Sequence, residues 1–357
     1  MKFLIIPIIQ LNTQYHIIDS IIYSFGINRY IERGGGEYMG IHEIITRLEH
    51  LRKKRNLLNG AITGVVIVFM MFIFFGQMSR ELQGLIMLLP FIMLGVVVAL
   101  LHVNTGITKE YKKLYKETFV KAVLSETFDN VEYYWEKGFD KNAVKGFALT
   151  RLGNIFRSED YLRARYKGIN FEQADVTIKY KTHGKNSHTT TYFKGRMFVF
   201  DVPEKSVVSV QVFSSNYLYR AGTIEKFKMN KVQMESEHFN KEFDVNAMNM
   251  MDAFLVLTPQ MMERIQKIKY TYGNIGMHFY GNKLYVGINM QGDAFDGSLN
   301  RKIDYYTEKQ ATMRDVQVIK DIIDTMGMEN ENFDNSNNSN SFANSDSTIK
   351  YSIPYNR

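Results

Sequence analysis

The sequence predicts an α+β protein with a transmembrane helical hairpin, then a helical stalk, then a mainly antiparallel-sheet cytoplasmic domain. Two observations lead to this fold class. Two long apolar runs lie close together within residues 57–103, and each is long enough to cross a hydrocarbon core of about 30 Å. Beyond about Arg163 the apolar residues recur towards every second position, which is typical of β-strands with one buried face.

The apolar runs Leu57–Phe75 and Leu82–Val103 predict two transmembrane helices. Neither run contains Asp, Glu, Lys or Arg, and each of these residues costs roughly 2.5–3.5 kcal/mol at the centre of a membrane helix. Because only the short polar segment 76–81 separates the runs, they are expected to form a hairpin. Gly60 and Gly64 form a small-xxx-small pair that lets another helix approach, so the sequence is compatible with a homo-oligomer.

Basic residues flank both ends of the hairpin, whereas its turn carries one Arg and one Glu. Because cytoplasmic flanks are enriched in Lys and Arg, both termini are predicted to be cytoplasmic, in a multi-pass protein of the cell (inner) membrane. The same side chains are expected to contact the lipid bilayer at its anionic headgroups. They are Arg52, Lys53, Lys54 and Arg55 before the first run, and Lys109, Lys112 and Lys113 after the second.

The beginning of the chain reads differently from the rest. Residues 1–38 resemble a leader, and the purine-rich codons that Glu32–Glu37 require are typical of a translated ribosome-binding site. We therefore expect natural translation to begin at Met39, so that residues 1–38 are not part of the natural product. Residues 39–56 predict an amphipathic basic helix, because their apolar residues recur at helical spacing with charges between them.

The remainder divides into three segments by composition and periodicity. Residues 104–162 are predicted to form a helical stalk or linker, with one helix over 108–136 and one or two short helices over 141–161. The α+β cytoplasmic domain is expected over 163–327. Residues 328–357 form an Asn/Ser-rich tail that is expected to be disordered, because few of its residues can be buried.

Within the cytoplasmic domain, four alternating segments predict successive antiparallel strands. They are 174–181, 189–195, 196–202 and 206–213. Two later strands are expected to form a hairpin around Gly281–Asn282. Thr258–Pro259 places a capping residue and a first-turn proline at a helix start, a helix-like segment precedes it from about Met248 to Leu257, and residues 303–326 predict the last helix.

Residues suited to catalysis are scarce. The chain has no cysteine, which excludes disulfides and thiolate sites, and it lacks a nucleophile elbow, a P-loop, a zinc-protease motif and a dinucleotide fingerprint. No cofactor or metal is therefore predicted. Asp160, Glu235 and Glu237 are weak candidates for acid–base catalysis. On a strand Glu235 and Glu237 would share a face.

Nucleic acid is not an expected partner. Lys226 and Lys228 lie on either side of Phe227, and such interleaving of basic and aromatic residues occurs in surfaces that bind nucleic acid. The solvent-facing side of an antiparallel sheet has the same composition, and the membrane anchor makes a lipid surface the nearer anion.

Four blocks of sequence, taken in order behind a two-helix hairpin, resemble a bacterial membrane-protein family known only as a domain of unknown function. The blocks are Ser158–Tyr161, Tyr192–Arg196, Glu235–Phe243 and Ala253–Gln260. The resemblance implies a membrane-anchored protein with a cytoplasmic α+β region, and a membrane protein of the LemA type as a partner. It implies no activity, cofactor or catalytic residue.

The function predicted from the sequence is a membrane-anchored cytoplasmic interaction or lipid-surface-binding module of unknown biochemical activity. The alternative is a membrane-associated enzyme that acts on lipid or another small substrate through Asp160, Glu235 or Glu237. The lack of catalytic motifs favours the first interpretation, in which the partners are the lipid bilayer and a protein.

Overall fold

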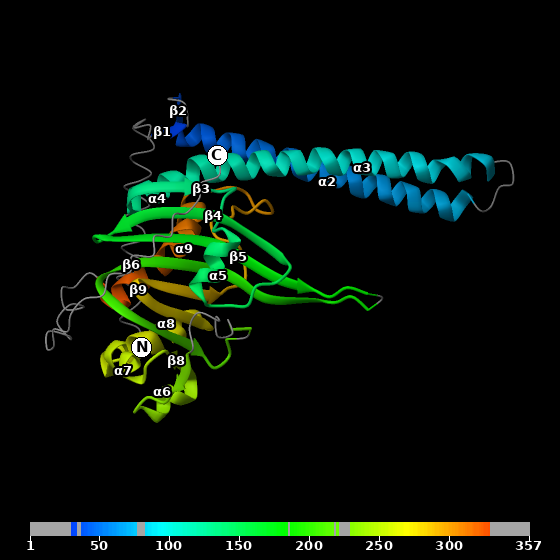
Figure 1. Cartoon of the computed structure of the whole chain (residues 1–357). Coiled ribbons are helices and arrows are strands. Elements are labelled where there is room, and N and C mark those ends of the chain that lie inside the picture. The colour runs from blue at the N-terminus through cyan, green and yellow to red at the C-terminus, as the bar shows by residue number, and fades with distance from the viewer. Residues whose placement is uncertain are drawn as a thin grey trace, which may run out of the picture. The chain divides into compact units, whose positions relative to one another are not determined.

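The chain divides into two compact units, which we call the helical unit and the sheet unit (Figure 1). The helical unit comprises Met1–Ala122 with Gly297–Glu308, and the sheet unit comprises Val123–Asp296 with Lys309–Arg357. The computed structural model describes residues 30–33, 37–76, 83–184, 186–217, 219–220 and 229–328. Most of the predicted leader, and the predicted tail beyond Met328, lie outside the described residues.

Two long helices dominate the helical unit: α2, Ile41–Gly76, and α3, Gln83–Leu114. The helices run antiparallel, because Asn59 and Asn104 share a 2.9 Å hydrogen bond while Arg47 pairs with Glu110 at 3.4 Å. A Cβ atom on Gly60 or Gly64 would meet nothing within 4 Å, so α3 does not pack on this glycine pair. The strands of the unit are β1, Tyr30–Arg33, and β2, Glu37–Gly40.

Of the segment 39–56, predicted as an amphipathic basic helix, residues 41–56 form the first part of α2, and Met39 and Gly40 belong to β2. Ile44, Leu48 and Leu51 are buried, whereas Leu57 is 77% exposed and Phe74 is 75% exposed. Apolar side chains near the start of α2 are therefore buried against protein. Apolar side chains further along the same helix are exposed.

Among the described residues, one helical stretch, Pro90–Thr127, is long and apolar enough to cross a membrane. It contains most of α3, followed directly by the π-helical turn η2, Tyr115–Val120, and by α4, Lys121–Thr127. Phe91 is 71% exposed and lies in the apolar part of this stretch. The stretch overlaps the second predicted transmembrane helix, while the first, in α2, stays a prediction.

The segment Gly297–Glu308 packs against the other end of the hairpin, within the helical unit. The Tyr111 hydroxyl donates to the carbonyl oxygen of Ser298 at 3.4 Å, and the backbone N–H of Ile303 donates to Glu49 at 3.3 Å. The Tyr115 hydroxyl donates to Glu308, a carboxylate that is 1% exposed, at 3.1 Å. This long-range segment completes the core at the base of α2 and α3, and the sequence did not predict it.

The sheet unit is built on a seven-stranded sheet with the order β3-β4-β5-β6-β8-β7, in which β9 also pairs with β6. All pairings are antiparallel, which confirms the predicted α+β class. The strands are β3, Asp129–Tyr134; β4, Ile155–Tyr166; β5, Ile169–Lys181; β6, Thr189–Ser214; β7, Asn230–Val232; β8, Phe243–Ala247; and β9, Ile275–Asn289.

The segment labelled β9 doubles back on itself at Gly281–Asn282, as predicted. The N–H of Asn289 donates to the carbonyl oxygen of Asn274 at 3.1 Å, and the rings of His278 and Tyr285 lie 5.9 Å apart. The two halves of β9 are therefore neighbours, and Gly281, with φ +60°, adopts the left-handed conformation of a hairpin turn.

The segment labelled β6 bends around this hairpin. Its first part, from Gly195 to Asp201, pairs with the second half of β9, and its later part, from Ser206 to Phe213, pairs with the first half. Figure 1 shows β6 curving in this way. The predicted strands 189–195 and 196–202 form one continuous run, and the predicted strand 206–213 returns on the other side of β9.

Two predictions for the stalk are wrong. Asp129–Tyr134 forms β3 instead of the end of a helix, and residues 155–161 belong to β4 instead of a short helix. The register of β4 against β5 shifts between Glu159 and Leu162, and Asp160 in this shift has φ +59°. The irregularity removes the alternation from the sequence, so only pairing with β5 reveals the strand.

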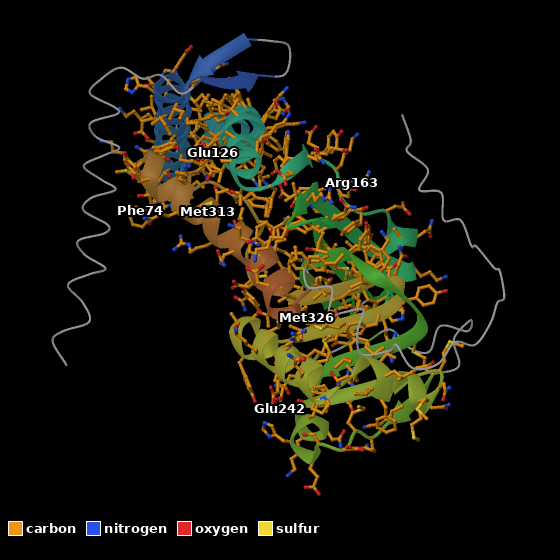
Figure 2. All side chains as sticks on the ribbon, turned by 90° about the vertical axis from the view of Figure 1, so that its left-hand side faces the viewer. Phe74, Glu126, Arg163, Glu242, Met313 and Met326 are labelled. Carbon is orange, nitrogen blue, oxygen red and sulfur yellow. The ribbon has the colours of Figure 1, made fainter. Side chains whose placement is uncertain are left out.

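The predicted helices of the sheet unit are confirmed. The Thr258 hydroxyl accepts from the N–H of Met261 at 3.2 Å and caps the helix at its first turn. In α9 the residues Val316, Ile319, Ile322 and Ile323 are buried, and Figure 2 labels Met313 and Met326 on this part of the helix. The helices are α5, Lys141–Phe147; α6, Glu237–Glu242; α7, Met250–Val256; α8, Pro259–Tyr272; and α9, Tyr305–Met326, whose first residues belong to the helical unit.

Replacing Gly195 by Ala is expected to destabilise the sheet unit by about 3 kcal/mol or more, because overpacking at a site that cannot move is costly. A Cβ atom there would collide with the carbonyl oxygen of Ile288 and lie 2.6 Å from the N atom of Met290. The measurement is the free energy of unfolding from denaturant titration of the full chain in detergent. Gly146→Ala, in α5 with nothing within 4 Å of the new atom, is the matched control and should raise stability by up to about 1 kcal/mol. Equal effects of the two substitutions would contradict the close approach.

Candidate functional site

The helical unit brings the first predicted basic cluster and Lys109 of the second cluster to one level of the hairpin. On α2 the first cluster lies between Arg47 and Asn59. On α3, Glu110 pairs with Arg47 and Asn104 bonds to Asn59, and Lys109 lies between these two partners. We call the whole set the basic collar: Arg52, Lys53, Lys54, Arg55, Lys109, Lys112 and Lys113. The structure thus places Lys109 beside a cluster that is about fifty positions earlier in the sequence, and Lys112 and Lys113 follow within the next turn of α3.

Most of the charge of the collar faces solvent. Lys53, Lys54 and Lys113 are exposed, whereas Arg52 donates to Glu49 at 2.6 and 2.8 Å. The hydrogen bond from Arg52 lowers the pKa of Glu49, which keeps this carboxylate ionised while it also accepts from Ile303. Arg52 therefore has a structural partner, whereas Lys53, Lys54 and Lys113 present their charge at the surface.

The three carboxylates predicted as weak catalytic candidates do not converge. Asp160 is fully buried in β4 and accepts a 2.6 Å hydrogen bond from the Tyr133 hydroxyl. Glu235 and Glu237 are exposed, and they follow β7, which is four strands from β4 in the order of the sheet. The strand conformation assumed for Glu235 and Glu237 is wrong, because Ser236 caps helix α6 and Glu237 is its first residue.

His238, which follows Glu237 in α6, contacts another helix. His238 Nε2 lies 3.4 Å from the hydroxyl of Tyr270. That hydroxyl donates to Glu242 at 2.9 Å. The arrangement links the short helix α6 to α8 at the surface of the sheet unit.

A buried cluster of charged residues lies beside β4, and sequence reasoning missed it. Arg196 on β6 is 4% exposed and forms ion pairs with Asp175 on β5, at 3.6 Å, and with Asp315 on α9. The backbone N–H of Ala294 donates to Asp175, and that of Phe295 donates to Asp315 at 2.9 Å. Burial raises the pKa of Asp175 to about 7, against the opposing effects of Arg196 and of the Ala294 N–H.

This cluster holds a turn in place. Phe295 is 1% exposed and has φ +55°, a conformation that a bulky residue rarely adopts. Two carboxylates accept from consecutive N–H groups of the turn, and the Arg196 guanidinium lies 5.9 Å from the Phe295 ring. The sequence signal is a charged residue at an inward position of an apolar strand, seen in Asp175 and Arg196.

Ser209 and His278 form a second buried polar pair. The Ser209 hydroxyl lies 2.8 Å from His278 Nε2, and His278 Nδ1 lies 2.9 Å from the carbonyl oxygen of Phe147. A carbonyl oxygen can only accept, so Nδ1 carries the proton and Nε2 accepts from the serine. The spacing is that of a nucleophile and its base, but Ser209 and His278 are at most 1% exposed. The pair therefore fastens the end of α5 to the sheet.

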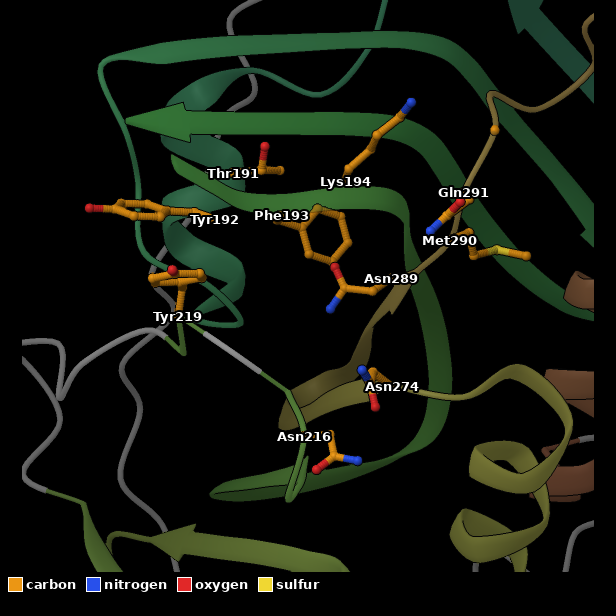
Figure 3. A pocket seen from close by; sticks show the side chains of 11 residues that line it. Thr191, Tyr192, Phe193, Lys194, Asn216, Tyr219, Asn274, Asn289, Met290 and Gln291 are labelled. Carbon is orange, nitrogen blue, oxygen red and sulfur yellow. The ribbon is translucent and has the colours of Figure 1, made fainter. Parts of the chain in front are cut away.

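A groove of about 590 Å³ lies at the end of β9 in the sheet unit (Figure 3). Of the described residues that line it, four carry a carboxamide and Lys194 is charged, with its Nζ atom 3.9 Å from Asp293. Tyr192 stacks on Tyr219 on one side, with ring centroids 4.7 Å apart. The lining residues are Thr191, Tyr192, Phe193, Lys194, Asn216, Tyr219, Asn274, Asn289, Met290, Gln291 and Gly292.

The described part of the chain contains no group of three or more His, Asp or Glu residues arranged to hold a metal ion. Lys226, Phe227 and Lys228, weighed above as a nucleic-acid surface, lie outside the described residues. Lys231, which follows them, pairs with Asp244 at 2.6 Å.

Comparison with known proteins identifies part of the chain. A family described as "Protein of unknown function (DUF3137)" matches residues 191–328, so this part is a domain of unknown function, as the resemblance implied. No curated protein matches the chain. A solved structure, the crystal structure of the mycobacterial trehalose monomycolate transport factor A, TtfA, is 9% identical over 60% of this chain and 93% of its own, with a TM-score of 0.33. That similarity is too weak to inform fold or function.

His278 is expected to make the sheet unit less stable as the pH falls. Burial lowers the pKa of His278 to about 4, whereas an unfolded chain binds this proton near pH 6.5. The unfolded state therefore binds more protons between these values, and the free energy of unfolding decreases from about pH 6.5 to about pH 4, by up to ~3 kcal/mol.

The measurement for His278 is a series of denaturant titrations across this pH range. Asp175 acts in the opposite direction, because its raised pKa favours the folded state at lower pH. The difference between the unaltered chain and His278→Gln therefore isolates the contribution of His278. His278→Gln should flatten the loss of stability on acidification, and His183→Gln, in an exposed loop, should not. A curve that is unchanged in His278→Gln would contradict the assignment.

Proposed function

We propose that this chain is a bacterial inner-membrane protein in which α2 and α3 cross the bilayer as a hairpin and the basic collar binds anionic headgroups. The sheet unit is held on the cytoplasmic side, where it binds a protein partner. The observation that carries the proposal is the order of surfaces along the helical unit: a base covered by protein, then the collar, then helices whose apolar side chains are exposed.

Exposure of the apolar side chains supports the hairpin. Large apolar residues at this density on a protein surface indicate contact with lipid or with another protein. They occur on both helices from the collar onward, with Leu57, Ile67, Val68, Met70, Met71 and Phe74 on α2, and Phe91, Ile92, Leu94, Val98 and Val103 on α3. The candidate span Pro90–Thr127 is one of the two crossings in this proposal.

The position of the collar supports contact with headgroups. A juxtamembrane Lys or Arg near an anionic surface contributes about 1 kcal/mol. Lys53, Lys54 and Lys109 are exposed close to where the apolar surfaces begin, and the exposed Lys113 lies one turn further along α3. The hydrogen bond between Asn59 and Asn104 lies one to two turns beyond this level, so the helices enter the apolar region already paired. The lack of Asp, Glu, Lys and Arg in both runs agrees with this placement.

The topology is tested with the full chain in its membrane. The chain should partition into the detergent phase, and a tag after Arg357 should resist protease added outside intact cells but be digested after the cells are opened. A tag inserted between Gln77 and Ser79 should be accessible from outside. Recovery of the chain in the aqueous phase, or digestion of the terminal tag in intact cells, would overturn the hairpin.

The role of the collar is tested by removing its charge. Lys53→Gln, Lys54→Gln, Lys109→Gln and Lys113→Gln together should lower the preference for anionic over neutral lipid by at least about fivefold, because even one such contact contributes about 1 kcal/mol. The measurement is the ratio of anionic to neutral lipid that copurifies with the chain from mixed vesicles.

The matched control removes four exposed lysines of the sheet unit. Lys141→Gln, Lys145→Gln, Lys241→Gln and Lys267→Gln change the net charge equally and should leave the lipid ratio near that of the unaltered chain. The same loss of preference in both variants would show a dependence on total charge, and it would remove the collar as the binding site.

A further inference from the structure

The groove at the end of β9 contains an open strand edge. On one side of β6, Thr189–Lys194 faces β5 over residues 177–181. On the other side, the pairing of β6 with β9 starts at Gly195. The N–H of Met290 donates to the carbonyl oxygen of Lys194 at 3.1 Å, and beyond Met290 the chain leaves this edge. Among the described residues, no strand pairs with this side of β6 before Gly195.

The groove lies along that open edge. Four consecutive residues of β6, from Thr191 to Lys194, line it, and Figure 3 shows the strand running along the groove. Backbone N–H and C=O groups of alternate residues point to each side of a strand, so part of the hydrogen-bonding capacity of this segment faces the groove. An exposed edge of this kind is a template for another strand.

The lining suits the backbone of a polypeptide. Asn216, Asn274, Asn289 and Gln291 each offer a carboxamide that can donate and accept, as a peptide group requires. A charged ligand finds little here, because Lys194 already has Asp293 at 3.9 Å. Tyr192 and Tyr219 provide an aromatic surface beside the edge. The ligand class that fits is an extended peptide segment.

We propose that the occupant is a segment of this chain, Thr348–Tyr351, which adds to the open edge of β6 as a strand. Its sequence, Thr-Ile-Lys-Tyr, is identical to that of Thr177–Tyr180 in β5. That β5 segment is the strand already paired with the opposite side of the same β6 residues, with Ile178 opposite Phe193 and Tyr180 opposite Thr190. The tail therefore carries a sequence that is compatible with these β6 side chains on a strand beside them.

The length of the chain permits this contact. Residues 329–347 separate the segment from the end of the described chain, and an extended chain covers at most about 3.3–3.6 Å per residue. Their reach of roughly 60 Å exceeds the roughly 40 Å across a domain of this size. The proposal does not depend on the membrane topology.

The test is hydrogen–deuterium exchange of the full chain in detergent, compared with a chain that ends at Met328. In the full chain the backbone amides within Thr189–Lys194 should exchange at least about tenfold more slowly. Amides of β3, which lie at the far edge of the sheet, should be equal in the two chains and show that the fold is intact. Equal exchange at Thr189–Lys194 overturns the proposal.

A pair of proline substitutions shows whether the named segment is responsible. Proline removes a backbone donor and is excluded from a central strand position. Ile349→Pro should therefore abolish the protection, and Asn338→Pro, in the spacer, should retain it. Protection that survives Ile349→Pro, or that disappears on tenfold dilution because a second copy supplies the segment, overturns the assignment to this part of the same chain.

Discussion

The sheet unit depends on the pairing of β6 with both halves of β9. Because β9 doubles back at Gly281–Asn282 and β6 bends around it, both outer edges of the β9 hairpin are hydrogen-bonded. Buried backbone groups need such partners. The first part of β6 then has its other edge on β5, and the later part has its other edge on β8. One nested pair of hairpins thus connects the two sides of the sheet.

Close packing at the centre of this arrangement restricts the residues that fit there. Gly195 has no room for a side chain against Ile288, and a Cβ atom on Gly287 would lie 3.0 Å from the hydroxyl of Tyr217. The rings of Phe213 and Tyr217, 5.4 Å apart, fill the space next to Gly276. Glycine here serves close approach of backbone and aromatic rings rather than flexibility.

Buried polar groups give the sheet unit its particular connections. Arg196 is expensive to bury alone, and the carboxylates of Asp175 and Asp315 compensate its charge while they also hold the turn at Ala294–Phe295. The Ser209–His278 pair holds α5 through the carbonyl oxygen of Phe147. In both cases a polar side chain of a strand reaches a backbone group far away in the chain, in the turn at Ala294 and at the end of α5. These contacts specify which loop packs where, a choice that apolar burial alone does not make.

The sequence by itself determined the elements whose signal is local. Helix α8 has its cap and proline at Thr258–Pro259, the hairpin of β9 has Gly281–Asn282, and α2 and α9 have stripes of apolar residues at helical spacing. The charge-free runs and their basic flanks are likewise local, because the water-to-lipid preference of a side chain depends on its own chemistry. For the same reason the seven residues of the collar could be named before their arrangement was known.

Only the tertiary structure decided the features that depend on partners far away in the chain. β4 is a strand because it pairs with β5, and β3 is a strand because it pairs with β4. In β4, Asp160 interrupts the alternation that would have indicated a strand. The cluster of Asp175, Arg196 and Asp315, and the pair of Ser209 and His278, each join residues from different elements, so no spacing in the sequence reveals them. A side chain's neighbours across a sheet are set by strand order and register, and these are properties of the whole fold.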